Sequence, residues 1–275
     1  MSVIRSVTEF IDKIKCLIGA NENLHSTKHL FYRGHSDNSY QLIPSALRGK
    51  NEHDILLDFK HYAPSHKVNY NFIDERDRVL VDMQHYGMPT RLLDWTIAPL
   101  NALFLACEKN IDKDGEIFIF NPWGFVKEER LLLDKNGHKK HPEMHQIHVI
   151  SRSLLSGGWE FNDIKNYIDD KFQFALNIND IELPYPFVAT FTNERILHQR
   201  GVFTIQGQNT SRQNILGNFN NYLSTFTING SEKRSILEDL NRLYINDYSI
   251  YPDFEGMKKM IDRSGGLFNL NSKVF

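Results

Sequence analysis

The chain contains 275 residues, of which 41% are hydrophobic and 24% are charged. This length and composition predict one large domain with a sizeable core and exclude a disordered chain. Lysine and arginine total 32 against 34 for aspartate and glutamate, which gives a net charge of −2. That balance argues against a protein that coats DNA with a uniformly basic surface, although it leaves room for a local basic groove.

Cysteine usage and hydropathy bear on the compartment. Cys16 and Cys107 are the only cysteines and lie far apart, which favours a reducing compartment and excludes a cysteine-based zinc site. The longest apolar run falls short of the ~18 residues that a membrane helix needs. The N-terminus also lacks a secretory pattern. We therefore expect a cytoplasmic protein that does not enter the membrane.

Apolar spacing predicts helices that alternate with strands. Residues at steps of three and four from Val3 to Leu17 predict a helix that faces the core and ends at Gly19. Turn residues and β-branched or aromatic runs mark the later elements. We expect strands at 30–34, 116–120, 187–191 and 202–206, and helices that begin near Asn51, Asp74, Pro99, Ser231 and Pro252. The predicted fold is α+β, a single domain with a mixed or antiparallel sheet and flanking helices.

The first candidate site is an arginine at the end of a strand. Arg33 can offer a rigid fork to a phosphate or a carboxylate, and Gly34 leaves room for a ligand to approach. A buried salt bridge at a turn would explain Arg33 equally well, so both interpretations stay open.

The second candidate site is the segment from His85 to Thr96, which we predict to be a loop between two helices. It holds an imidazole, a phenol, two hydroxyls, an arginine, a carboxylate and an indole. Loops so dense in functional groups are more often sites than connectors. Helix capping by Asp94 or Thr96, or an ion pair between Arg91 and Asp94, would explain only some of these groups.

These segments resemble the ordered signature of the FRG domain family, which is named after a Phe-Arg-Gly motif. The chain departs at the first letter, because Tyr32 precedes Arg33. The remaining parts of the signature are 85–96 with the helix after Pro99, Arg195-Ile196 with Gln199 and Gly201, and Tyr251-Pro252-Asp253. The resemblance predicts an FRG domain at 25–262, between an N-terminal helix (1–24) and a C-terminal tail (263–275).

The chain is also similar, more distantly, to ADP-ribosyltransferases. Arg33-Gly34 matches their first motif, and the segment before Ala102 loosely matches the second. Their third motif, a Glu-x-Glu strand, would fall where Asn193 and Arg195 stand; Glu194 would point to the opposite face of that strand. The resemblance implies an ADP-ribosyltransferase-like core that takes NAD as its substrate and needs no metal.

NAD cleavage assigns a role to each candidate residue. Cations bind the pyrophosphate, aromatic rings hold the nicotinamide, and a carboxylate such as Asp94 or Glu194 stabilises the charged ribose. We expect Asp94 to be partly buried and paired with Arg33 or Arg91. The catalytic candidates are Arg33, Asp94, Thr96 and Gln199, and the NAD-binding candidates are Tyr32, Arg33, Gly34, His85, Tyr86, Thr90, Arg91 and Arg195.

Three functional hypotheses follow. The first is an NAD-consuming enzyme that modifies a protein or a nucleic acid, such as a bacterial toxin or an antiphage effector with an antitoxin or regulatory partner. The second is a nucleotide- or nucleic-acid-sensing module without turnover, which the missing Glu-x-Glu favours. The third is a hydrolase or nuclease that uses Arg33, His85 and Asp94. The histidines between His138 and His148 are typical of a solvated basic loop rather than a metal site. The first hypothesis predicts that Arg33 and the 85–96 segment line one cleft.

Overall fold

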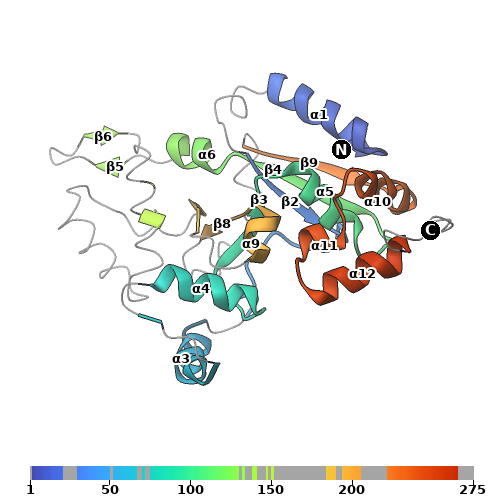
Figure 1. The fold of residues 1–275 in the computed structure, drawn as a ribbon. Coiled ribbons are helices and arrows are strands. Elements are labelled where there is room, and N and C mark those ends of the chain that lie inside the picture. The colour runs from blue at the N-terminus through green and yellow to red at the C-terminus, as the bar shows by residue number, and fades with distance from the viewer. Residues whose placement is uncertain are drawn as a thin grey trace.

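A computed structural model describes residues 2–20, 30–49, 52–66, 70–71, 75–129, 132–133, 138–140, 147, 150–151, 184–189, 194–205 and 222–265. Its central layer is a seven-stranded sheet of order β1-β9-β4-β2-β3-β8-β7 (Figure 1). Only β1 and β9 pair in parallel, so the sheet is mixed and the predicted α+β fold is confirmed. The strands are β1 (Ser2–Ile4), β2 (Phe31–His35), β3 (Leu92–Thr96), β4 (Gly115–Phe120), β7 (Tyr185–Phe187), β8 (Gly201–Ile205) and β9 (Leu223–Ile228). A separate small sheet pairs β5 (Leu132–Leu133) with β6 (Lys139–Lys140).

Helices surround the sheet (Figure 1). They are α1 (Val7–Ala20), α3 (Glu52–Tyr62), α4 (Arg76–His85), α5 (Pro99–Cys107), α6 (Pro122–Glu129), α9 (Glu194–Gln199), α10 (Lys233–Arg242), α11 (Asp247–Ile250) and α12 (Phe254–Ser264), with 3-10 turns η1 (Ala63–His66) and η5 (Gly230–Glu232). Helix α3 lies beyond α4, away from the strands (Figure 1). Among the described helices, none combines the length and hydropathy needed to cross a membrane.

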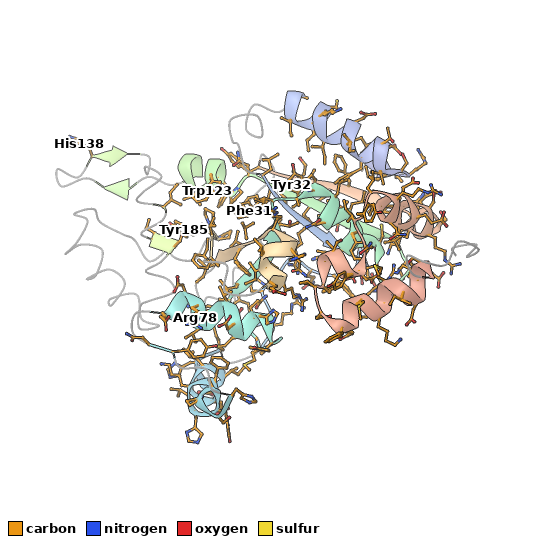
Figure 2. The ribbon with its side chains drawn as sticks, in the orientation of Figure 1. Phe31, Tyr32, Arg78, Trp123, His138 and Tyr185 are labelled. Atoms are coloured by element: carbon orange, nitrogen blue, oxygen red, sulfur yellow. The ribbon has the colours of Figure 1, made fainter. Side chains whose placement is uncertain are left out.

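Two apolar cores lie on opposite faces of the sheet. Successive residues of a strand point to opposite faces, so Phe31 belongs to one core and its neighbour Tyr32 to the other (both labelled in Figure 2). The Tyr32 core contains α1, α5 and α10 side chains. The Phe31 core contains Trp95 and Phe120, whose ring centroids lie 5.4 Å apart. Apolar side chains therefore pack on both faces of the sheet.

The sheet splits between β2 and β3. Strand β2 pairs with β4 along its whole length, and β3 does the same with β8. Between β2 and β3, however, only Tyr32 and Thr96 are paired. The sheet therefore consists of two half-sheets, β1-β9-β4-β2 and β3-β8-β7, that are joined at one residue pair and diverge beyond it.

Several predicted elements were wrong. The 85–96 segment is not a loop throughout, because it contains β3. Leu92 and Leu93 are both buried, so the sequence lacks the alternation of apolar and polar residues that is typical of a strand. The strand expected around Arg195 is helix α9, with Asn193 outside the described residues. The N-terminal helix begins only at Val7 and continues past Gly19. Strands β1 and β9 were not predicted.

Candidate functional site

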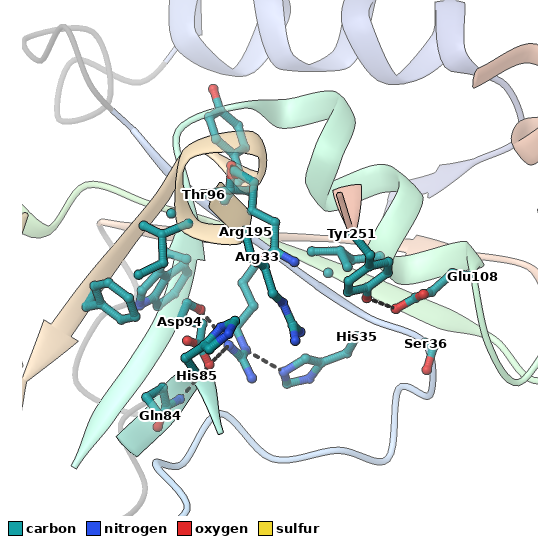
Figure 3. Close-up of a pocket in the computed structure, with 18 of the residues that line it drawn as sticks. Arg33, His35, Ser36, Gln84, His85, Asp94, Thr96, Glu108, Arg195 and Tyr251 are labelled. Atoms are coloured by element: carbon teal, nitrogen blue, oxygen red, sulfur yellow. Dashed lines mark hydrogen bonds and ion pairs between the residues drawn. The ribbon is translucent and has the colours of Figure 1, made fainter. Parts of the chain in front are cut away.

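A pocket of about 440 Å³ opens where β2 and β3 diverge (Figure 3). Polar side chains reach it from β2, β3, α4 and α9 and from the segments that follow β2, α5 and α11. Arg33 and the 85–96 segment therefore share one cleft, as the sequence predicts. The polar lining includes Arg33, His35, Gln84, His85, Asp94, Arg195, Gln199 and Tyr251.

Arg33 closes the gap between the two half-sheets. Its Nη1 donates to the Asp94 carbonyl oxygen, where a sheet would place a backbone amide, and lies 3.8 Å from the Asp94 carboxylate. Its Nε donates to His35 Nε2 at 2.9 Å. Burial, and then the charge of Arg33, lowers the pKa of His35 to about 3, so this histidine is neutral and accepts a hydrogen bond. Arg33 is thus a fixed cation at the centre of the pocket.

Asp94 is exposed to the pocket and held by a second donor. Its side chain is 53% exposed, so the expected partial burial was wrong, whereas the expected Arg33 partner is present. Gln84 Nε2 donates to Asp94 Oδ2 at 2.7 Å. A carboxylate that faces solvent in this way can contact a ligand without breaking an ion pair in the core.

Arg195 supplies a second cation. Its guanidinium lies 4.9 Å from the centre of the Tyr251 ring, and the Tyr251 hydroxyl donates to Glu108 at 2.7 Å. Within the described part of the chain, no carboxylate lies within ion-pair distance of Arg195. Burial and then the Arg195 charge lower the pKa of His85. Arg195 is therefore oriented by stacking and its hydrogen-bond donors remain available to an anion.

Arg33 lies between two groups of polar side chains in the pocket. Figure 3 places Ser36 and Glu108 on one side and Gln84 and Asp94 on the other, with Arg33 between them. The lining also includes the apolar side chains of Trp95 in β3, Phe203 in β8 and Ile196 in α9. Such a lining suits a ligand that carries both an anionic group and an apolar or aromatic part.

Residues 28–115 match the FRG domain family. The match spans Arg33, Gly34 and the 85–96 segment, so the resemblance seen in the sequence is confirmed there. Arg195 and Tyr251 lie outside the matched residues, and the extension of the domain to residue 262 stays a prediction. No curated protein and no solved structure matches the chain significantly.

Several of the predicted site residues line the pocket and also hold the fold together. Thr96 Oγ1 donates to the Gln199 carbonyl at 2.6 Å and so ties β3 to α9. A Cβ on Gly34 would lie 2.1 Å from the Ala102 carbonyl oxygen. Gly34 thus allows α5 to pack on β2, rather than leaving space for a ligand. Tyr32 is also buried in the α5 core.

Three predicted residues are not part of the pocket lining. Arg91 forms a 2.7 Å ion pair with Glu52, and both side chains are almost fully buried. Thr90 is buried and donates to Gln84 Oε1. Tyr86 is 66% exposed and packs edge-on against His85. The geometry therefore leaves Arg33 and Arg195 as the predicted arginines that face the pocket.

The sequence interpretation missed some lining residues. Gln84 directly precedes the 85–96 segment, yet nothing in its local pattern distinguishes it. Tyr251 belongs to the FRG-like signature but had no role assigned. Glu108 and Lys109 become site residues only through the fold. Among the described residues, no group of three His, Cys, Asp or Glu side chains is arranged to hold a metal; His141, His145 and His148 lie outside them.

Proposed function

We propose that the chain binds NAD in the split-sheet pocket and transfers ADP-ribose from it to a macromolecular acceptor. The observation that carries the proposal is that two guanidiniums, Arg33 and Arg195, line the same pocket as the exposed carboxylate of Asp94. Two cations match the two charges of a pyrophosphate. A carboxylate beside them matches the positive charge that develops on the ribose during cleavage.

The reaction requires little from the protein beyond electrostatics. The bond between the ribose C1′ and the nicotinamide nitrogen breaks, and its electron pair leaves with nicotinamide. Positive charge spreads over C1′ and the ring oxygen. A nucleophile of the acceptor then forms the new bond to C1′ and loses its proton. In this proposal Asp94 stabilises the charged ribose, because a preorganised opposite charge stabilises such a transition state most.

A binding module without turnover is the second candidate. It is favoured by the small number of acidic groups that the pocket offers. Glu108 already accepts a hydrogen bond from Tyr251, so Asp94 alone would have to replace the two glutamates of the Glu-x-Glu motif. A sensor would use the same cations to hold a nucleotide or a nucleic-acid end. The acceptor in the first candidate, a protein or a nucleic acid, and a role as a toxin or an antiphage effector are further parts of the enzyme proposal.

Nicotinamide release and NAD binding separate the two candidates. We would incubate the full chain with NAD, alone and with RNA, DNA or cell lysate, and measure free nicotinamide together with the dissociation constant of NAD by calorimetry. Release supports the enzyme, and binding without release supports the sensor. Neither binding nor release would refute both.

A matched pair of arginine variants links the result to the pocket. Arg195→Ala should weaken NAD binding about 10- to 100-fold, the range of a lost hydrogen bond to a charged group. Arg234→Ala removes an exposed arginine of α10 outside the pocket and should leave binding unchanged. Equal effects of the two substitutions would contradict binding at this site.

A further inference from the structure

We propose that Gln84 positions the Asp94 carboxylate, and that Thr90 determines which end of the Gln84 amide faces Asp94. This inference rests on the proposed function, in which Asp94 faces the ribose. Neither the FRG match nor the sequence pattern gives Gln84 a role. The inference also changes the role of Thr90 from a ligand contact to a residue that orients Gln84.

Three hydrogen bonds in series determine the direction of the Gln84 amide. The Leu92 amide donates to Thr90 Oγ1 at 3.2 Å, and the Thr90 hydroxyl donates to Gln84 Oε1. The two ends of an amide have nearly the same shape, so its neighbours decide which end points where. Because Oε1 is engaged by Thr90, the NH₂ group faces Asp94 and donates to Oδ2 at 2.7 Å.

The chain of bonds runs from the interior to the pocket. Thr90 is fully buried, Gln84 is half-buried at the end of α4, and Asp94 is exposed on β3. A long or exposed side chain keeps one geometry only when its partners hold it there. The buried Thr90 hydroxyl therefore fixes Gln84, and Gln84 in turn restrains the Asp94 carboxylate. Without Gln84, that carboxylate would be held only by Arg33 at 3.8 Å.

Both supporting contacts reach the same oxygen of Asp94. Gln84 Nε2 and Arg33 Nη1 each lie nearest to Oδ2. In the described residues, no hydrogen bond reaches Oδ1, which leaves that oxygen to a ribose hydroxyl or to the developing charge. Gln84 thus holds Asp94 by one carboxylate oxygen and leaves the other available to a ligand.

Substitution Gln84→Glu tests the contact without using turnover. It replaces the donor by a carboxylate beside Asp94, and two carboxylates at this distance share one proton. By carboxyl-carbon NMR of the full chain, the Asp94 signal should titrate at a higher pH in Gln84→Glu than in the wild type. Gln199→Glu is the matched control, since it adds the same charge to the pocket at a residue with no hydrogen bond to Asp94. An Asp94 titration that is the same in both variants would overturn the proposal.

Turnover then tests the consequence for the proposed reaction. Gln84→Ala should lower kcat for nicotinamide release about tenfold, the scale of one hydrogen bond, with KM for NAD nearly unchanged. Thr90→Ser keeps the hydroxyl and should retain the wild-type rate, while Thr90→Val should resemble Gln84→Ala. If Thr90→Val does not fold, the rates of Gln84→Ala and Thr90→Ser still test the positioning role of Gln84. A wild-type kcat in Gln84→Ala would contradict the positioning role.

The two proposals fail in different ways. If the wild-type chain releases no nicotinamide, the NAD reaction is refuted while the NMR titration still reports on Gln84 and Asp94. If nicotinamide is released but the titration of Asp94 is unchanged in Gln84→Glu, the proposed reaction is supported and the positioning role is refuted.

Discussion

Two arginines on either side of the split sheet show what separates a structural ion pair from a site. Arg91, just before β3, is closed off with Glu52 at 2.7 Å, and both side chains are buried. Arg33, in β2, lies 3.8 Å from a carboxylate that is half exposed. The first pair completes its hydrogen bonds within the protein. The second leaves charge facing a cavity.

The difference teaches that density of functional groups in sequence does not itself identify a site. Arg91 and Asp94 are three residues apart in the same segment, yet one stabilises the fold and the other lines the pocket. What separates them is whether the fold supplies a buried partner. The following predictions test that distinction, beginning with the largest effect.

Breaking the Arg91–Glu52 pair should have the largest effect on stability. Arg91→Met leaves the Glu52 carboxylate buried without its cation, which costs about 3–5 kcal/mol. The free energy of unfolding in urea measures this cost. Arg33→Met serves as the comparison and should cost clearly less, because Asp94 remains solvated. Equal losses would remove the distinction between the two arginines.

Asp94→Asn should act on turnover rather than on stability. Nicotinamide release should fall about a hundredfold or more, as on removal of one preorganised electrostatic group. The free energy of unfolding should change by less than about 1 kcal/mol, since the pair is exposed. A large loss of stability with activity proportional to the folded fraction would place Asp94 with Arg91 as a structural residue.

Gly34→Ala should destabilise the protein by packing. The added Cβ would lie 2.1 Å from the Ala102 carbonyl oxygen, so α5 must move away from β2 at a cost of about 1–3 kcal/mol. Gly19→Ala in α1 is the control, because a Cβ on Gly19 would meet nothing within 4 Å. Thermal unfolding of both variants compares them. An unchanged melting temperature for Gly34→Ala would contradict the close approach of α5.

Acid should destabilise the fold through His35. Its folded pKa of about 3 lies below the unfolded value of about 6.5, so in that interval the unfolded chain binds a proton that the folded chain does not. Stability should therefore fall as pH decreases from about 6.5 towards 3, by up to about 1.4 kcal/mol per pH unit. His35→Gln keeps an acceptor for Arg33 and should flatten this part of the profile. An equally steep profile for His35→Gln would show that other groups cause the loss.

Sequence reasoning predicted the helices and strands whose pattern is local. Helix α5 begins at Pro99 as predicted, and β2 was found through its aromatic residues. The predicted end of β2 at Gly34 was wrong, because the strand continues to His35 and Arg33 lies in its middle. Strand β3 was missed because residues on both of its faces are buried, and α9 because a six-residue helix shows too little periodicity. Arg195 and Gln199 nevertheless line the pocket, since residues four apart share a face of a helix.

The site was predicted where one segment carries several groups and missed where long-range contacts create it. The cleft between Arg33 and Asp94 follows from two conspicuous segments. The burial of Arg91 depends on Glu52, which lies 39 residues away and has no distinguishing pattern. Likewise, Glu108 lines the pocket and accepts a hydrogen bond from Tyr251, which lies 143 residues away. Partners distant in sequence decide which polar groups remain available.

The single residue pair between β2 and β3 has a consequence for amide exchange. Amides in the middle of a sheet are ordinarily the slowest to exchange with solvent, since they open only with the whole domain. Here the middle contains an internal edge, where a guanidinium replaces part of the backbone ladder. Deuterium should therefore enter β2 and β3 beside the pocket sooner than it enters the β4–β9 ladder. A ligand that fills the gap would slow that uptake at the centre of the fold.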